Sequence, residues 1–252
     1  MDNQIITGYP SLDKILGGGL HPGEVTVLSG DDVDASILSL NILLNNLLRN
    51  PYVNAGKGNI LLFSVFESSA DTVERMVCIE AGYEKHTGTP AETVQKKIAD
   101  VINQLKETNF YIEEAQTLTI NEIVEKATNL KQASGLEFIV IESFQALIRR
   151  KPPYHPFGDP EEAVHAATKI KRLAKDWNVP ILVLYFPPHR PKFPPDMCGA
   201  MLDMGDNIIR LAFDEEAHIL KAEVTKSSHG TMGTVDFIYE NRWKRIRLYG
   251  DY

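Results

Sequence analysis

Short apolar runs alternate along the chain with longer stretches in which apolar residues recur at helical spacing. The short runs have strand length, and we expect buried strands at residues 25–29, 59–64, 136–142 and 179–185. Helices are expected between them, at residues 37–48, 70–82, 120–135 and 161–177. Strands that alternate with helices in this way predict an α/β fold, with a mostly parallel central sheet and helices on both faces.

The C-terminal part of the chain follows a different pattern. Apolar and polar residues alternate at residues 208–213, 219–225 and 234–239, with polar turns between these runs. Such alternation with short connections predicts antiparallel hairpins that bury one face. A basic run follows at residues 242–247, and we expect it to be a solvated edge strand. The whole pattern is interpreted as one domain over residues 1–252.

The loop after the first predicted strand has the layout of a phosphate-binding loop without its residues. Nucleotide-binding loops follow the pattern G-x-x-x-x-G-K-S/T, in which backbone amides wrap the phosphates, the Lys neutralises them and the hydroxyl holds magnesium. Here the residues are Gly30, Asp31, Asp32, Val33, Asp34, Ala35 and Ser36, with no Lys before Lys57. Three carboxylates in this place would repel a triphosphate. The loop is expected to reject ATP, and Asp32 or Asp34 would cap the next helix.

Composition narrows the class of protein. The chain has 252 residues, 43% hydrophobic and 24% charged, which is the ordinary range for a globular protein. Its net charge of −8 and pI near 5.4 give no general attraction to nucleic acid or to an anionic membrane. Its two cysteines favour a reducing compartment, and no stretch approaches about 18 uninterrupted apolar residues. We therefore expect a cytoplasmic protein that does not span a membrane and holds no metal.

Several stretches together resemble one known family. They include Thr7-Gly8, Gly18-Gly19-Leu20 and Pro22-Gly23-Glu24 before the loop, and Leu173-Ala174-Lys175 and Asn178-Val179-Pro180 leading into the fourth predicted strand. In this order they look like the RecA-type core of DnaB-family replicative helicases, and the resemblance runs from about Thr7 to Trp243. It implies a RecA-like α/β fold with C-terminal hairpins, and a family chemistry that uses ATP and magnesium.

The family's catalytic positions are mostly changed in this chain. The resemblance places Phe66 where the family has the Glu that polarises the attacking water, and Glu67 stands one residue later. Because side chains alternate along a strand, we expect Glu67 to point away as a solvated charge. Phe186 replaces a phosphate-sensing Gln, and Ser228, two residues after Lys226, replaces the family's Arg finger. The resemblance places Glu142 at the position of an Asp that orients a magnesium-bound water. It is the one acid of the set that could still perform its role.

Two loops carry cations that the resemblance assigns to the family's central DNA channel. The candidate DNA-binding residues are Arg149, Arg150, Lys151, Arg190 and Lys192. Salt-dependent contacts with single-stranded DNA would use such cations. A solvated turn before a helix is the equally open alternative for the first of the two loops.

Three functions are compatible with these observations. The leading hypothesis is a non-catalytic DnaB/RecA-like domain that acts as an interaction or structural protein, beside an active replicative helicase or in a mobile element. The alternatives are a single-stranded DNA-binding protein that uses the channel-type loops, and a divergent ATP-dependent DNA helicase. Because little of the family's helical linker precedes Thr7, and both faces of its nucleotide site are changed, we expect a monomer or small oligomer rather than a nucleotide-dependent hexamer.

Overall fold

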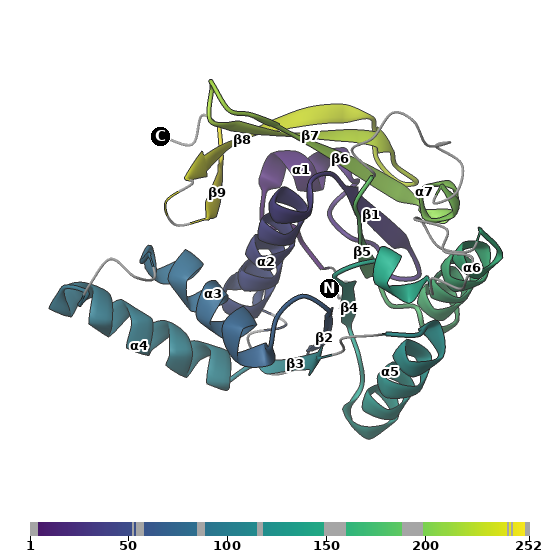
Figure 1. Cartoon of the computed structure of the whole chain (residues 1–252), viewed down its shortest axis with the longest axis horizontal. Helices are drawn as coiled ribbons and strands as arrows, with labels where there is room; N and C mark the ends of the chain where they lie inside the picture. Colours follow the sequence, from purple (N-terminus) through teal and green to yellow (C-terminus); the bar gives the residue numbers. More distant parts are fainter. Residues whose placement is uncertain are drawn as a thin grey trace, which may run out of the picture.

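The computed structural model shows a central nine-stranded sheet, with the strand order β3-β2-β4-β5-β1-β6-β7-β8-β9 (Figure 1). The structure describes residues 5–51, 53, 58–84, 89–114, 118–148, 160–187, 199–240, 242 and 244–249. Six neighbouring strands pair in parallel, from β3 to β6, and the last three are antiparallel. The predicted α/β fold with C-terminal hairpins is confirmed.

The strands lie close to where the apolar runs predicted them. The parallel strands are β1 (Val25–Ser29), β2 (Asn59–Ser64), β3 (Asn109–Glu114), β4 (Phe138–Ile141), β5 (Ile181–Tyr185) and β6 (Asn207–Asp214). The antiparallel strands are β7 (Ile219–Lys226), β8 (Gly233–Glu240) and β9 (Arg245–Leu248). β1, β2, β4 and β5 are buried along their whole length, as central parallel strands are when helices cover both faces.

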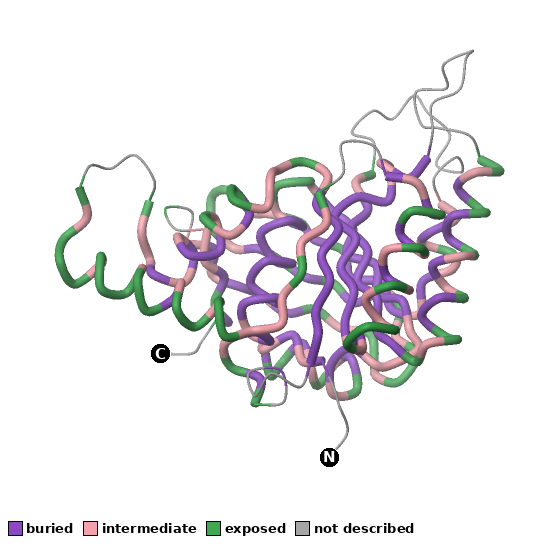
Figure 2. Tube along the Cα trace, turned by 90° about the horizontal axis from the view of Figure 1, so that it is seen from below, coloured by how far each residue is buried: buried purple, intermediate pink, exposed green. Residues whose placement is uncertain are grey.

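Two layers of helices enclose the parallel part of the sheet (Figures 1 and 2). One layer holds α1 (Pro10–Ile15), α2 (Asp32–Arg49), α3 (Ser69–Ala81) and α4 (Glu92–Lys106); the other holds α5 (Ile120–Ser134), α6 (Pro160–Trp177) and α7 (Ala200–Met204). Consecutive residues of β1 show the division, because Val27 packs with the core under α6 and Leu28 with the core under α2. A short 3-10 turn, Gln145–Leu147, follows β4.

The C-terminal strands curve over α2 and enclose it. Apolar residues of β6 to β9 share one core with α2, which explains why that helix is buried almost all round. Among the described residues, no strand pairs with the outer edge of β9, and side chains bond to the backbone there instead. Asn41 of α2 donates to the Lys244 carbonyl at 3.2 Å and accepts from the Ile246 amide at 3.3 Å, and the Tyr9 hydroxyl donates to the Ile246 carbonyl at 3.2 Å. The basic edge strand is thus fixed to the core.

Candidate functional site

The loop from Gly30 to Ser36 lies at the carboxyl end of β1, in the middle of the parallel sheet. This edge of an open α/β sheet is where such folds bind ligands. Gly30 is needed for the turn, because a Cβ there would lie 2.8 Å from the Cβ of Leu211 on β6. Its amide donates to the Tyr185 carbonyl at 3.3 Å, which ties the loop to β5. The scaffold of a nucleotide loop is therefore present.

The start of α2 is capped by the loop's own carboxylates. The cap residue is Asp31, whose side chain accepts from the Val33 amide at 3.1 Å; the side chain of Asp32 accepts from the same amide at 2.9 Å. The prediction of Asp32 or Asp34 as the cap was wrong by one residue, because α2 already begins at Asp32. Amides at a helix N-terminus attract anions, and here aspartates already occupy that environment.

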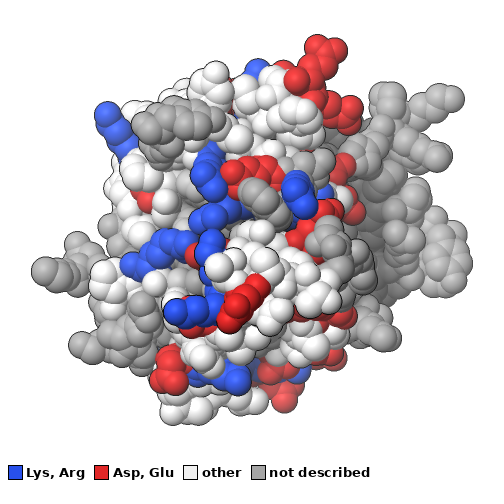
Figure 3. Space-filling view, turned by 90° about the vertical axis from the view of Figure 1, so that its left-hand side faces the viewer, with Lys and Arg blue, Asp and Glu red and all other residues white. Residues whose placement is uncertain are grey.

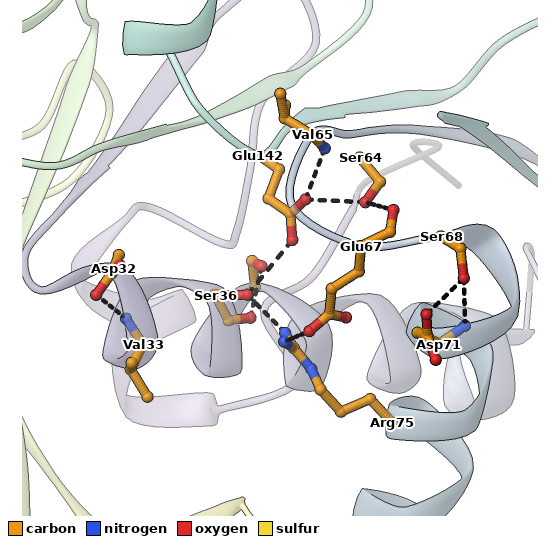
Figure 4. Close-up of polar contacts among 11 residues, drawn as sticks. Asp32, Val33, Ser36, Ser64, Val65, Glu67, Ser68, Asp71, Arg75 and Glu142 are labelled. Atoms are coloured by element: carbon orange, nitrogen blue, oxygen red, sulfur yellow. Dashed lines mark hydrogen bonds and ion pairs between the residues drawn. The ribbon is translucent and has the colours of Figure 1, made fainter. Parts of the chain in front are cut away.

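Ser36, one turn further along α2, is held by an internal cation (Figure 4). The Arg75 guanidinium, from α3, donates to the Ser36 hydroxyl at 2.6 Å through Nη2 and forms an ion pair with Glu67 at 2.5 Å through Nη1. The Ser36 hydroxyl in turn donates to Glu142 Oε1 at 3.5 Å. Arg75 therefore stands beside the serine and the acid that the resemblance assigns to magnesium.

Glu142 follows β4 and is part of the scaffold. Only 3% of it is exposed, and its Oε2 accepts from the Ser64 hydroxyl and the Val65 amide, each at 3.0 Å. A buried carboxylate needs such donors, because an unpaired charge in the interior is costly. These contacts link the ends of β2 and β4, and they account for an acid at this position without a metal.

Glu67 departs from its predicted orientation. We expected the one-residue offset to turn it into solvent, yet it pairs with Arg75, and its Oε2 is buried without a hydrogen-bond partner. The reason is that β2 ends at Ser64, so strand alternation no longer sets the direction of a side chain three residues beyond. Glu67 thus lies in the same network as Ser36 and Glu142 (Figure 4).

Apolar side chains form the mouth of this site. Phe66 is 58% exposed and lies 5.8 Å, centroid to centroid, from Phe186 at the end of β5, while Val33 is 52% exposed. Phe66 and Val33 border a cavity of about 210 Å³, whose lining residues are Asp32, Val33, Ser36, Ile37, Phe66, Arg75, Glu142 and Lys244. The aromatic residues that replace the family's Glu and Gln therefore meet each other at the opening.

Lys244, between β8 and β9, is a lining residue that the sequence pattern did not predict. It lies more than two hundred residues from the loop, so only the fold brings it here. Its Nζ is 5.5 Å from the ring centroid of Tyr239. Burial raises the pKa of the Asp34 carboxyl, and the Asp31 charge raises it further, whereas Lys244 opposes the shift. Burial and the nearby Asp34 also raise the pKa of Tyr239 to about 12.

The loop that carries Lys226 and Ser228 lies at the other end of β1. His229 pairs with Glu24, immediately before β1, at 2.9 Å, whereas Gly30 immediately follows that strand. A five-residue strand separates the two ends by roughly 15–20 Å. Within one chain, therefore, Ser228 does not meet Ser36 or Glu142.

Backbone contacts hold this second loop in place. Lys226 Nζ donates to the Gly205 carbonyl at 2.6 Å, the Ser228 amide donates to Asn207 Oδ1 at 3.0 Å, and the Ser228 hydroxyl donates to the Asp206 carbonyl at 3.2 Å. The position that the resemblance assigns to an Arg finger is thus a short side chain bound to its own scaffold.

The predicted DNA-binding cations lie outside the described residues. Those residues are Arg149, Arg150, Lys151, Arg190 and Lys192. Within the part of the chain that the structure describes, no group of three or more His, Cys, Asp or Glu side chains could hold a metal ion. No helix in that same part has both the length and the apolar character needed to cross a membrane.

The family model and the relatives that match this chain point to the same family. The model of the DnaB-like helicase C terminal domain matches residues 4–185. Replicative DNA helicase DnaB of Geobacillus stearothermophilus is 22% identical over 261 residues, and replicative DNA helicase DnaC of Bacillus subtilis is 21% identical over the same length. Each alignment covers 96% of this chain and 56% of the relative. The chain thus spans little more than half the length of these relatives.

Solved structures share the fold at low sequence identity. One of them, described as an ATPase domain, superposes with a TM-score of 0.82 at 16% identity, covering 98% of this chain and 93% of that one. A DnaB-like replicative helicase, whose structure was described with its interactions with primase, gives a TM-score of 0.78 at 14% identity; 96% of this chain and 61% of that one are covered.

Proposed function

Because the chain belongs to the family of DnaB-like helicase C-terminal domains, we propose that it is a member that acts without nucleotide chemistry. In this proposal residues 1–252 form one domain that works in the cytoplasm as an interaction or structural protein in DNA replication or in a mobile element. Its partner would be a protein such as an active replicative helicase. The similarity to replicative helicases supports the setting, and the site supports the lack of catalysis.

The observation that carries the proposal is the charge of the site. Five carboxylates line or adjoin the cavity, against two cations among the described residues. The acids are Asp31, Asp32, Asp34, Glu67 and Glu142, and the cations are Arg75 and Lys244. Two like charges 4 Å apart repel by about 4 kcal/mol at the effective dielectric near a protein surface. A triphosphate would meet such repulsion several times over.

The remaining cations are already engaged. Arg75 is bound to Glu67 and Ser36, and Lys244 lies over the Tyr239 ring and acts on Asp34. A phosphate would have to displace these contacts before either cation could bind it. The observed network thus supplies from within the chain the positive charge that magnesium supplies in the family's chemistry.

Catalysis would fail even if nucleotide bound. Phosphoryl transfer depends on positioning and on charge stabilisation, and an Arg finger alone contributes about a thousandfold or more in rate. The chain has Phe66 for the Glu that polarises water, Phe186 for the sensing Gln and Ser228 for the finger. Each replacement removes a charge or a hydrogen-bonding group that could act in the transition state.

The second candidate function, binding of single-stranded DNA, depends on loops outside the described residues. The described surface gives it little support. Lys and Arg side chains form a band on the side that carries α3, α4 and β9, but acidic side chains lie among them (Figure 3). Arg49 pairs with Glu80 at 2.6 Å and Arg247 with Glu240 at 3.2 Å. Cations with acidic neighbours attract a phosphate backbone less than unpaired ones do.

Light scattering of the purified chain with and without ATP-magnesium tests the proposal. We expect a monomer or small oligomer whose mass is the same in both conditions, because neither end of β1 has kept nucleotide-dependent contacts. ADP-magnesium and magnesium alone serve as controls for ionic effects. A hexamer that forms only with ATP would contradict the non-catalytic function and favour the divergent helicase.

A further inference from the structure

The mouth of the former nucleotide site combines exposed apolar side chains with unusually concentrated negative charge. Phe66 and Val33 are each more than half exposed, although most large apolar residues of the chain are buried. Asp31, Asp32 and Asp34 stand in the same loop as Val33. Exposed apolar surface with a polar rim marks interaction sites more often than bare surface does.

The two aromatic side chains at this mouth lie against each other and are not scattered singly. Phe66 follows β2 and Phe186 follows β5, and their rings come within 5.8 Å although β4 lies between the two strands in the sheet. Gln145 Nε2 donates to the Phe186 carbonyl at 2.6 Å and fixes the backbone beside that ring. Phe66 also lines the cavity that continues inward to Ser36 and Glu142.

The charge decides which class of ligand this surface fits. The surrounding carboxylates outnumber the cations, and burial together with mutual repulsion raises the pKa of Asp34. An incoming cation would relieve that repulsion, whereas an anion would increase it. The exposed aromatic ring of Phe66 offers a further favourable contact to a guanidinium or ammonium group.

We propose that this mouth is a docking site for a partner protein segment that places an Arg or Lys beside apolar side chains, with the cation at Asp31, Asp32 and Asp34 and the apolar residues against Phe66, Phe186 and Val33. The inference rests on the proposed function, since it assigns a protein to the site from which nucleotide is excluded. Charge complementarity is the argument for this occupant, because the acidic loop selects a basic segment and excludes an acidic one.

Defined peptides test this directly. The probe is the blocked peptide Ser-Leu-Arg-Phe-Arg-Ser, compared with Ser-Leu-Glu-Phe-Glu-Ser and with Ser-Ser-Arg-Ser-Arg-Ser. We expect the first to shift the amide NMR resonances of Val33 and Phe66 at concentrations of about 1 mM or below. The Met232 resonance, in the loop at the other end of β1, should stay in place. The acidic peptide should give no shift, and the peptide without apolar residues should bind at least about fivefold more weakly.

Two variants locate the site, and a third controls for total charge. Phe66→Ala, at an exposed position that leaves the core intact, and the double variant Asp32→Asn/Asp34→Asn should each weaken binding by about fivefold to tenfold. The matched control is Glu215→Gln/Glu216→Gln, in the exposed turn between β6 and β7. It removes the same number of charges and should leave binding unchanged.

The outcomes separate this inference from the proposed function. Shifts that are absent, that appear equally with the acidic peptide, or that weaken equally in the control variant would overturn the docking site. If the Val33 and Phe66 resonances shift with protein concentration in the absence of peptide, the occupant of the site is a second copy of this chain and not a partner protein. If ATP-magnesium at micromolar concentration displaces the peptide, the docking site stands and the nucleotide-free function fails.

Discussion

The two ends of β1, where the family's nucleotide chemistry would lie, are built in different physical ways. At the carboxyl end the loop keeps its concave form, and carboxylates and exposed apolar residues surround a cavity. At the amino end the loop before β8 is fixed to the scaffold: the Thr231 amide donates to the Ile15 carbonyl at 2.8 Å, and a Cβ on Gly230 would lie only 1.8 Å from that same oxygen. One end is still shaped as a site, whereas the other has become framework.

This difference shows which properties of a fold are separable. The parallel strands and the turn at Gly30 depend on burial and backbone geometry, and they persist without any ligand. Phosphate chemistry depends on a few charges at the surface, and in the proposed function it fails because Asp34 and Ser228 stand where the resemblance places a neutral residue and a cation. In the proposed function and docking site, the cavity is kept while the class of ligand that it attracts changes from anionic to cationic.

The largest effect is expected at the fixed end, from Gly230→Ala. The added methyl group would clash with the Ile15 carbonyl, so the backbone of the loop must move. This movement breaks the hydrogen bond from the Thr231 amide to that carbonyl. We expect a loss of about 3 kcal/mol in the free energy of unfolding, measured by urea denaturation. Met232→Ala, in the same loop at a side chain that is 75% exposed, should change it by less than about 0.5 kcal/mol. Equal effects would show that the loop is not fixed.

At the open end, Arg75→Ala should have the next largest effect. It removes the cation that binds Ser36 and Glu67, so the Glu67 carboxylate loses its ion pair and the Ser36 hydroxyl keeps only its 3.5 Å bond to Glu142. We expect a loss of about 2 kcal/mol, as for hydrogen bonds to charged groups. The control is Arg49→Ala, which breaks the ion pair of a more exposed Arg with Glu80 and should cost less than about 1 kcal/mol. A loss no greater than that of the control would mean that the internal cation does not hold the site.

A third prediction concerns the two loops that carry the candidate DNA-binding cations and lie outside the described residues. Should single-stranded DNA bind at all, replacing Arg149, Arg150, Lys151, Arg190 and Lys192 together by Ala should weaken binding at least about tenfold and flatten its salt dependence, because phosphate contacts release counterions. Fluorescence anisotropy at several salt concentrations measures both. Unchanged affinity in this variant would refute the assignment of DNA binding to these loops.

The smallest effect concerns Asp34 and the pH dependence of stability. Burial raises the pKa of its carboxyl in the folded state above the ordinary value of 3.8, so ionisation destabilises the fold once the pH rises above about 3.8. Asp34→Asn should therefore be slightly more stable than the parent at pH 7, and the difference should vanish near pH 3. Thermal unfolding at both pH values measures it. A variant that is less stable at pH 7 would contradict this assignment.

Most of the fold could be predicted from the sequence, because burial determines both the pattern and the structure. The run 59–64 became β2 without change, and the helix predicted at residues 120–135 became α5, which begins after a capping box of Thr119 and Glu122. Local sequence signals failed where the end of a strand or helix, or a contact distant in sequence, determines the direction of a side chain. Glu67 turned inward because β2 had already ended, and the cap fell on Asp31 rather than on its neighbours.

The site was predictable only in part. The sequence from Asp31 to Ala35 shows by itself that the phosphate-binding residues are absent. It does not show which side chains surround the cavity instead. The approach of Phe66 to Phe186 requires the strand order, and the approach of Lys244 requires the C-terminal strands to curve over α2. Arg75 lies within the helix predicted at residues 70–82, yet nothing in the sequence indicates that it would bind Ser36.

Calorimetric titration of the chain with ATP-magnesium tests the central claim most directly. The account predicts no measurable heat of binding in the micromolar range, because carboxylates surround the cavity and its cations are engaged. We expect Asp34→Gly with Ala35→Lys to restore binding at most, without hydrolysis, since Phe66 and Ser228 remain. Micromolar affinity of the unmodified chain for ATP-magnesium would contradict the account.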